Sequence, residues 1–121
     1  MGATERVLIV EDELHALAGL AELVSGWGYR TETARDGIEG LEKVAEWFPG
    51  IIETDLKMPR MDGFALVKAG LDFKPDLKVL MMTGYAQDPP PDLIRERQIE
   101  ILRKPFNLDR LCQMADAMTG A

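Results

Sequence analysis

Residues 7–13 read VLIVEDE, in which four apolar residues are followed directly by three acidic ones. Four consecutive apolar positions favour a strand covered on both faces, because a strand with one face in water would alternate apolar and polar residues. Residues 79–82 (VLMM) show the same pattern. Shorter strands are expected at residues 51–52 and 99–102, and a weaker one at residues 30–33 near an edge of the sheet.

The segments between these strands are predicted to be helices. Apolar residues recur at three- and four-residue spacing in three segments, which is typical of helices with one buried face. The expected buried residues are Leu14, Leu17, Ala18, Ala21 and Val24; Ile38, Leu41, Ala45 and Phe48; and Leu108, Leu111, Cys112, Ala115 and Met118. A shorter helix is expected from Gly63 to near Leu71, and another after the prolines at 89–91, since proline fits a first helical turn. Five strands alternating with five helices predict an α/β fold, a doubly wound five-stranded parallel sheet with helices on both faces.

The composition limits the classes of protein to consider. The chain has 121 residues, fewer than the roughly 150 of a typical domain, so a single domain over residues 1–121 is expected. Its 14 basic and 21 acidic residues give a net charge of −7, which argues against direct nucleic-acid binding. One cysteine and one histidine exclude an intrachain disulfide and a zinc site of clustered Cys or His ligands. No run approaches the roughly 20 apolar residues of a membrane span, so we expect a cytoplasmic protein.

Charged or hydroxyl side chains follow the strands, at the point where each strand ends. Glu11 and Asp12 come after the first strand, Asp55 after the third, Thr83 after the fourth and Lys104 after the fifth. Because parallel strands joined by right-handed crossovers end at one edge, these side chains should share one crevice. Three carboxylates there repel one another unless a cation intervenes, and an all-oxygen ligand set suits Mg²⁺. A lysine and a hydroxyl beside them suit the oxygens of a transferring phosphoryl group, so the sequence predicts a phosphoryl site with a carboxylate nucleophile.

Four motifs occur in order at these strand ends: VLIVEDE, TDLKMPRMDG, MMTGYA and RKPF. Together they resemble the receiver (response-regulator) domain of two-component signalling, over about residues 5–118. The resemblance implies the flavodoxin-like strand order 2-1-3-4-5. It also implies that Asp55 accepts a phosphoryl group from a histidine kinase or a histidine phosphotransfer protein. By the family pattern, Mg²⁺ would be held by Glu11, Asp12, Asp55 and the backbone carbonyl of Lys57, and phosphoryl oxygens would be bound by Thr83 and Lys104.

The resemblance has further implications for signalling. The face built by the fourth helix, the fifth strand and the fifth helix would signal to a partner or to a fused or separate output domain. Phosphorylation could also drive dimerisation. The domain would catalyse only its own phosphorylation and autodephosphorylation, and it would bind neither nucleic acid nor membranes. Lys57 and Tyr85 would flank the path of the water that attacks the phosphorylated aspartate.

Two positions depart from the family pattern. Glu53 is acidic in a strand that is usually apolar, which suggests that this position lies nearer an exposed strand edge. Ile101 stands where receivers usually carry Tyr or Phe as the moving partner of the threonine, and an aliphatic side chain cannot reproduce the inward swing of a phenol. Among the remaining reactive side chains, Cys112 is expected in the core and His15 on a helix surface.

Three other functions are compatible with parts of this pattern. A degenerate receiver could act as a constitutive interaction module, although every acceptor residue is present here. A flavodoxin-like electron carrier would share the architecture, but a flavin phosphate needs backbone N–H and hydroxyl donors where this chain has residues 11–13, all acidic. A phosphatase of the aspartyl-phosphate kind would need a second carboxylate two residues after Asp55, where Lys57 stands.

Overall fold

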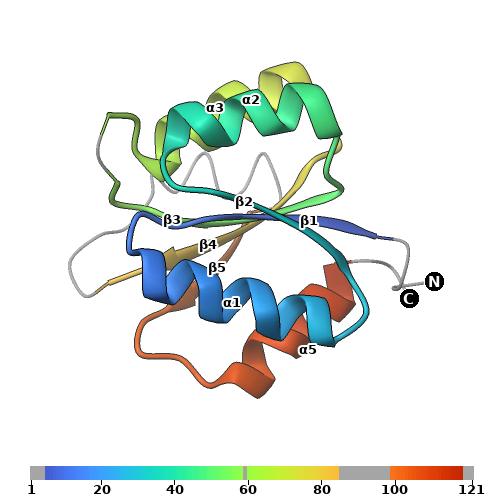
Figure 1. Cartoon of the computed structure of the whole chain (residues 1–121). Coiled ribbons are helices and arrows are strands. Elements are labelled where there is room, and N and C mark those ends of the chain that lie inside the picture. The colour runs from blue at the N-terminus through green and yellow to red at the C-terminus, as the bar shows by residue number, and fades with distance from the viewer. Residues whose placement is uncertain (1–4, 59, 85–98, 119–121) are drawn as a thin grey trace.

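Residues 5–58, 60–84 and 99–118 are described by the computed structural model, and they form one parallel sheet flanked by helices (Figure 1). In chain order the elements are β1 (Arg6–Val10), α1 (Leu14–Gly26), β2 (Arg30–Ala34), α2 (Gly37–Trp47), β3 (Ile51–Asp55), α3 (Gly63–Phe73), β4 (Lys78–Thr83), β5 (Ile99–Arg103) and α5 (Leu108–Met118). The five strands lie in the order β2-β1-β3-β4-β5. The predicted fold and strand order are therefore confirmed, whereas the helix expected after the prolines at 89–91 lies outside the described residues. Within those residues, each helix is too short or too polar to cross a lipid bilayer.

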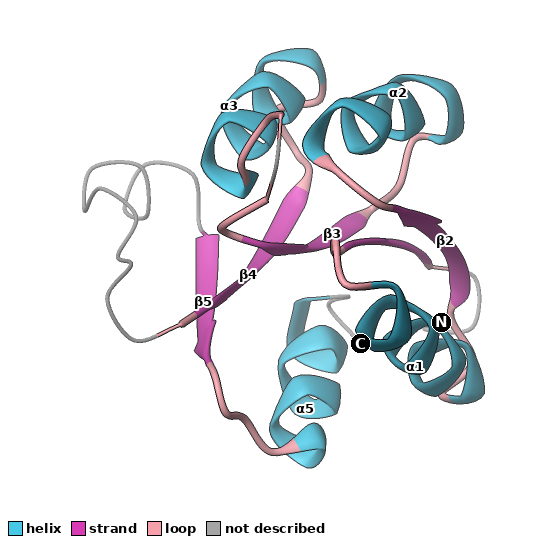
Figure 2. Cartoon of the chain, turned by 60° about the vertical axis from the view of Figure 1, so that its left-hand side comes forward, coloured by secondary structure: helices cyan, strands magenta, loops and turns pink. Residues whose placement is uncertain are grey.

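Two helical layers enclose the sheet. Figure 2 shows α2 and α3 on one face and α1 and α5 on the other. Along β1 the side chains alternate between the layers: Leu8 and Val10 join the cluster with α2 and α3, whereas Val7 and Ile9 join the cluster with α1 and α5. All four are fully buried, which explains why this strand is apolar at consecutive positions. β2 is an edge strand, as the sequence predicts for residues 30–33.

The buried face of α1 differs from the predicted one. Leu17 and Val24 are buried as expected, but Leu14 is 56% exposed and Ala18 is also exposed. Leu20 packs against the core in their place. The cause is that α1 carries alanine and leucine on more than one side, so the spacing of apolar residues alone does not select the face that meets the sheet.

The buried face of α2 combines two glycines with Val44. Gly37 and Gly40 are buried, whereas Ile38 and Phe48, both expected in the core, are 39% and 55% exposed. A Cβ added to Gly40 would lie only 3.1 Å from a methyl carbon of Leu66 in α3. The absence of a side chain therefore lets α2 approach α3 closely, while Leu41 and Trp47 pack against the core beside Val44.

α5 follows its predicted apolar stripe in part. Leu111 and Ala115 are buried as expected, and Met114 is buried beside them. Leu108, at the first position of the helix, is half exposed, so its predicted burial was wrong. Cys112 is only half-buried, and its Sγ lies at the rim of the core instead of inside it.

Glu53 does not lie near an exposed strand edge, and that expectation was wrong. It sits at the middle of β3, the central strand, between Ile9 of β1 and Leu80 of β4. Its side chain is fully buried, and neither carboxylate oxygen has a hydrogen-bond partner among the described residues. Burial raises the pKa of Glu53 to about 7, because the charged form loses its hydration.

Candidate functional site

The carboxyl ends of β1 and β3 bring three acidic side chains together. One carboxylate oxygen from each of Glu11, Asp12 and Asp55 can be chosen so that all three lie within 4.8 Å of one another. Glu11 is buried, Asp55 is half-buried and Asp12 is exposed, so the cluster runs from the interior to the surface. The structure therefore assembles the three carboxylates that the sequence places at the ends of separate strands.

The electrostatics of this cluster favour a cation. Burial raises the pKa of Glu11, and the charge of Asp55 adds to the rise, although a hydrogen bond from the backbone N–H of Glu13 at 3.1 Å opposes it. A buried carboxylate beside a second carboxylate is costly to keep ionised unless positive charge is supplied. The donor atoms are all oxygens, which is the set that Mg²⁺ prefers. The residues present thus fit a magnesium ion that would also keep water ligands on the exposed side.

Lys104 supplies a fixed positive charge at the same edge. Its Nζ lies 3.0 Å from Oδ1 of Asp55 and 3.6 Å from Oε1 of Glu11. Burial by itself would lower the pKa of Lys104, but the hydrogen bond to Asp55 and the charges of both carboxylates outweigh burial and raise it. The backbone N–H of Lys104 donates to the carbonyl of Thr83 at 2.7 Å, which ties the lysine to the end of β4. Lys104 therefore stays charged and pointed at Asp55.

Thr83 ends β4 beside this cluster. Its side chain is fully buried, and Oγ1 has no hydrogen-bond partner among the described residues. A buried hydroxyl without a partner is costly, so a ligand oxygen brought to this edge would relieve that cost. A Cβ added to the next residue, Gly84, would meet nothing within 4 Å, so the chain leaves space there. Tyr85, which the sequence places beside the water path, lies outside the described residues.

The loop between β3 and α3 begins directly at Asp55. The backbone N–H of Leu56 donates to Oδ1 of Asp55 at 3.1 Å and to the carbonyl of Met82 at 3.0 Å, so the start of the loop is held against the sheet. Its far end is closed by the N–H of Gly63, which donates to the carbonyl of Leu56 at 2.7 Å. A Cβ on Gly63 would overlap the carbonyl oxygen of Asp55. Lys57, whose carbonyl is the fourth predicted metal ligand, lies exposed within this closed loop.

Two residues near this loop were not identified from the sequence. Arg60 lies in the loop with a positive φ of 67°, and its guanidinium donates to Oδ2 of Asp36, the N-cap residue of α2. The sequence does show a helix start at Asp36, but an arginine gives no sign of a left-handed backbone, which glycine or asparagine would usually mark.

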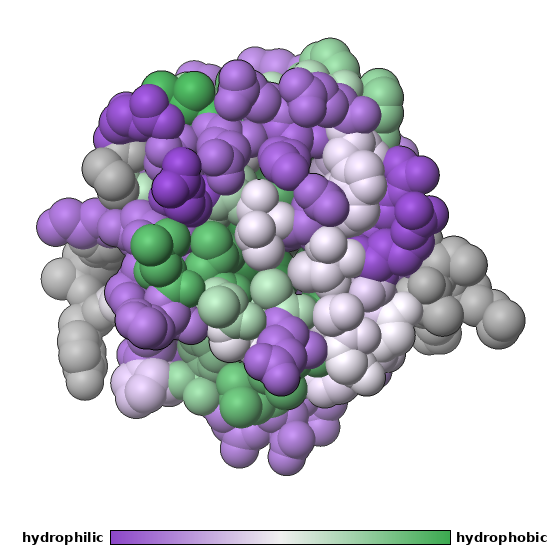
Figure 3. All heavy atoms as spheres, in the orientation of Figure 1, coloured by the Kyte–Doolittle hydropathy of each residue, from purple (hydrophilic) through white to green (hydrophobic). Residues whose placement is uncertain are grey.

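An apolar hollow of about 590 Å³ opens next to the carboxylates. Glu11 and Lys104 form its polar end. The rest of its lining comes from α1, the end of β4 and the connection between β5 and α5: Ala16, Gly19, Leu20, Leu23, Met82, Pro105, Phe106 and Leu108. Figure 3 shows apolar side chains gathered on this face, over α1 and the start of α5. The carboxylate cluster and Lys104 thus adjoin an apolar surface, which suits contact with another macromolecule more than with a small polar ligand.

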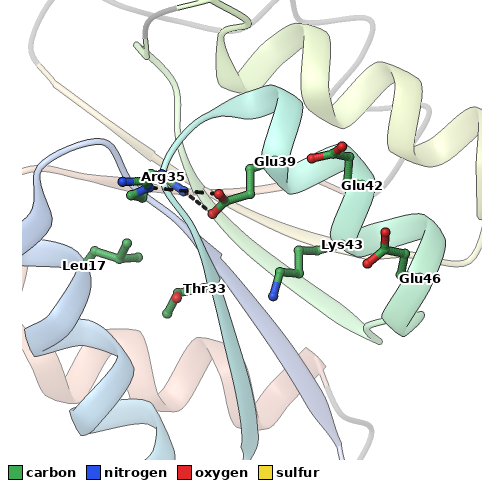
Figure 4. A pocket seen from close by; sticks show the side chains of 7 residues that line it. All are labelled: Leu17, Thr33, Arg35, Glu39, Glu42, Lys43 and Glu46. Carbon is green, nitrogen blue, oxygen red and sulfur yellow. Dashed lines mark hydrogen bonds and ion pairs between the residues drawn. The ribbon is translucent and has the colours of Figure 1, made fainter.

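A second hollow, of about 520 Å³, lies between β2 and α2 (Figure 4). Both of its basic side chains are paired: Arg35 with Glu39 at 4.0 Å, and Lys43 with Glu32 of β2, outside the lining, at 2.7 Å. None of the carboxylates of the cluster lines it. This hollow is therefore separate from the candidate site.

Comparison with known proteins gives a consistent result. The chain matches the family model described as response regulator receiver domain over residues 7–116. It is 34% identical over 106 residues to the transcriptional regulatory protein ZraR of Klebsiella oxytoca, covering 87% of this chain and 24% of that protein. It is 30% identical over 115 residues to the response regulator receiver protein CpdR of Brucella abortus, covering 94% of this chain and 96% of CpdR. Sporulation initiation phosphotransferase F of Bacillus subtilis is 30% identical over 111 residues, which is 88% of this chain and 87% of that protein.

Solved structures share the fold over nearly the whole chain. A response regulator receiver domain protein from Clostridium thermocellum superposes with a TM-score of 0.84 at 25% identity, covering 94% of this chain and 93% of that one. The response regulator TrrA from Thermotoga maritima, solved in complex with Mg²⁺ and BeF, also has a TM-score of 0.84 at 25% identity, covering 94% of this chain and 98% of TrrA.

Proposed function

This chain belongs to the family of response regulator receiver domains of two-component systems, and from that membership we propose that Asp55 is its phosphoacceptor. The phosphoryl group would come from a histidine kinase or a histidine phosphotransfer protein. The observation that carries this proposal is the position of Asp55, which lies with Glu11 and Asp12 in one carboxylate cluster and has the Lys104 ammonium 3.0 Å away.

The chemistry assigns a role to each side chain. A carboxylate oxygen of Asp55 attacks phosphorus, the Oδ–P bond forms, and the bond from phosphorus to the donor's histidine nitrogen breaks. Lys104 neutralises charge on a phosphoryl oxygen, and the Thr83 hydroxyl donates a hydrogen bond to another. A bound Mg²⁺ would offset the charge that the carboxylates and the phosphoryl oxygens share. Glu11, Asp12, Asp55 and the carbonyl of Lys57 would hold that ion.

Phosphorylation becomes a signal only if it changes the protein surface. Because Thr83 has no hydrogen-bond partner among the described residues, its hydroxyl is available to turn toward a phosphoryl oxygen and draw the end of β4 with it. Ile101 of β5 is half-buried and pairs in register with Met81, so this step would act through the backbone of β4 and β5 without an aromatic side chain. We expect the response on the face formed by β5, α5 and the segment before β5, whose expected helix lies outside the described residues.

The partners follow from the same proposal. The apolar hollow beside Glu11 and Lys104 would seat the phosphodonor, since a donor histidine must pass this surface to reach Asp55. The relatives include a much longer protein and one of about the same length: the chain spans 24% of the length of ZraR but 96% of CpdR. A fused or a separate output domain, and a dimer formed on phosphorylation, are therefore both compatible with the chain. We do not expect direct binding to nucleic acid, and a cytoplasmic location remains a prediction.

The acceptor can be tested by intact-protein mass spectrometry. We expect incubation with acetyl phosphate and Mg²⁺ to add the mass of one phosphate, and chelation of the metal to prevent it. Asp55→Asn should not be modified, because an amide is not a nucleophile toward phosphorus in this setting. Modification that persists in Asp55→Asn would assign the acceptor elsewhere, and no modification of the unaltered protein would favour a constitutive interaction module.

A further inference from the structure

The loop between β3 and α3 rests on the first turn of α2. A Cβ added to Gly37 would overlap the carbonyl oxygen of Met61, so the two backbones touch at this point. The loop is also closed at its ends by Leu56 and Gly63, whose backbones are hydrogen bonded at 2.7 Å. Between these fixed points Met58 is buried in the core, whereas Lys57 and Arg60 are exposed, so a link at Arg60 adds a restraint on the exposed side of the loop.

Asp36 and Arg60 supply a polar link across this contact. Nε of Arg60 donates to Oδ2 of Asp36 at 3.1 Å, and Nη2 of Arg60 donates to the same oxygen. The other oxygen, Oδ1, accepts the backbone N–H of Glu39 at 2.9 Å and so caps α2. One carboxylate thus joins the start of α2, through Oδ1, to the middle of the loop, through Oδ2.

The backbone of Arg60 adopts a conformation that is unfavourable for an arginine. Its φ of 67° lies in the left-handed region, which disfavours residues with a side chain. Glycine would adopt this conformation freely, but glycine could not reach Asp36. The arginine side chain is 59% exposed, so its pair with Asp36 adds little to global stability and does not by itself explain the strained backbone. A role in positioning the loop would account for both the exposed ion pair and the left-handed backbone.

We propose that Arg60 is a positioning residue whose pair with Asp36 holds the β3–α3 loop, and with it the carbonyl of Lys57, in the place that a magnesium ion at Asp55 requires. This inference rests on the proposed function, because it assumes that the carboxylate cluster binds Mg²⁺. It assigns Arg60 no contact with the ion or with the phosphoryl group. The guanidinium acts through Asp36 and the loop backbone alone.

The sign of one effect separates this role from simple electrostatics. Arg60 is a cation in the loop that begins at the carboxylate cluster, so removing its charge should by Coulomb's law leave Mg²⁺ binding unchanged or strengthen it. Loss of the loop restraint should instead weaken binding, since the Lys57 carbonyl would no longer be held in place. Loss of a group that orients a metal ligand typically costs on the order of tenfold in metal affinity. The two explanations therefore predict different changes for the same variant.

Arg60→Gly is the variant to measure, because glycine accepts the left-handed backbone and removes the link; Asp36→Asn, which leaves the loop backbone unaltered, controls for the added flexibility of glycine. We expect its Mg²⁺ dissociation constant, from calorimetric titration of the whole chain, to rise on the order of tenfold. Hydrogen exchange of the loop amides should become faster without metal, while the urea midpoint changes little. Arg30→Gly, which removes a cation from exposed β2, is a matched control and should leave both the dissociation constant and the loop exchange unchanged.

Asp36→Asn gives an independent check, because asparagine still caps α2 but loses the charge that holds Arg60. The double variant should bind Mg²⁺ no more weakly than the weaker single variant, because the two residues act through one link. Unchanged or tighter Mg²⁺ binding by Arg60→Gly would overturn the positioning role while leaving the proposed function intact. Absence of Mg²⁺ binding by the unaltered protein would overturn both.

Discussion

The ammonium of Lys104 lies 3.0 Å from Oδ1 of Asp55, although the two residues follow strands that are separated by β4. Lys104 directly follows β5, its peptide bond to Pro105 is cis, and its side chain contacts the carboxylates of both Asp55 and Glu11. The pair places a fixed positive charge beside the proposed acceptor before any ligand arrives. It is therefore the contact from which the chemistry of the site can be tested most directly.

Replacing Lys104 should separate metal binding from phosphoryl transfer. In Lys104→Met, we expect the rate of phosphate incorporation from acetyl phosphate to fall by roughly a hundredfold, as when one charge-stabilising donor is lost. Mg²⁺ affinity should stay equal or increase, because a competing cation has been removed. Lys68→Met is the control, because it makes the same change at an exposed position of α3. Equal incorporation rates for the two variants would contradict the role of Lys104.

The carboxylate cluster makes a prediction about stability. Asp12 is its exposed member, and removing its charge relieves repulsion with Glu11 and Asp55. Asp12→Asn should therefore unfold at a slightly higher temperature than the unaltered protein when Mg²⁺ is absent. It should also lose most of the stabilisation that added Mg²⁺ provides through binding to the folded state. Glu22→Gln, an equal charge change at an exposed position of α1, should keep the full Mg²⁺-induced shift in melting temperature.

The main features of the site could be predicted because they depend on topology. Parallel strands end at one edge, so residues after strands that are far apart in sequence must meet there. This reasoning brought Asp55 and Lys104 together without any knowledge of side-chain geometry. The membership of Glu11 in the same group followed from its place directly after the apolar residues 7–10 of β1.

Other features depend on packing that sequence spacing does not encode. α2 has two candidate faces, and the one that meets the neighbouring elements carries Gly37, Gly40 and Val44, because the glycines allow a closer approach. Glu53 looked like a position near an edge, since burying a carboxylate without a partner is costly and seldom observed. Arg60 gave no sequence signal, because glycine or asparagine usually marks a left-handed backbone and its partner Asp36 lies in a different part of the chain.

Two glycines test how tightly the site loop is packed. A Cβ on Gly63 would overlap the carbonyl of Asp55, so Gly63→Ala should lower the free energy of unfolding by about 1–3 kcal/mol and weaken Mg²⁺ binding. Gly19 lies in the exposed middle of α1, where a Cβ would meet nothing within 4 Å. Gly19→Ala should instead stabilise the protein by about 0.5–1 kcal/mol, because alanine restricts the unfolded chain and favours helix. Urea titration measures the free energy of unfolding of both variants. A similar change in the two would show that the loop is not closely packed around Gly63.

The buried carboxyl of Glu53 predicts a dependence of stability on pH. In the unfolded chain its pKa is about 4.3, whereas burial raises the pKa in the folded protein to about 7. Between these values the folded protein retains a proton that the unfolded chain has released. The free energy of unfolding should therefore decrease as the pH rises through this window, by on the order of 3 kcal/mol, and Glu53 should cause no further loss above it.

Glu53→Gln removes the ionisation but keeps the shape of the side chain. We expect the variant to match the unaltered protein near pH 4.5 and to exceed its free energy of unfolding at pH 8, measured by urea titration at both values. Glu11, whose pKa is also raised, contributes a dependence of the same sign in both proteins, so the difference between them isolates Glu53. Glu42→Gln, on the exposed side of α2, should retain the original pH dependence. If Glu53→Gln loses stability between pH 4.5 and 8 as steeply as the unaltered protein does, the carboxyl of Glu53 is not protonated in the folded state and must have a partner that keeps it ionised.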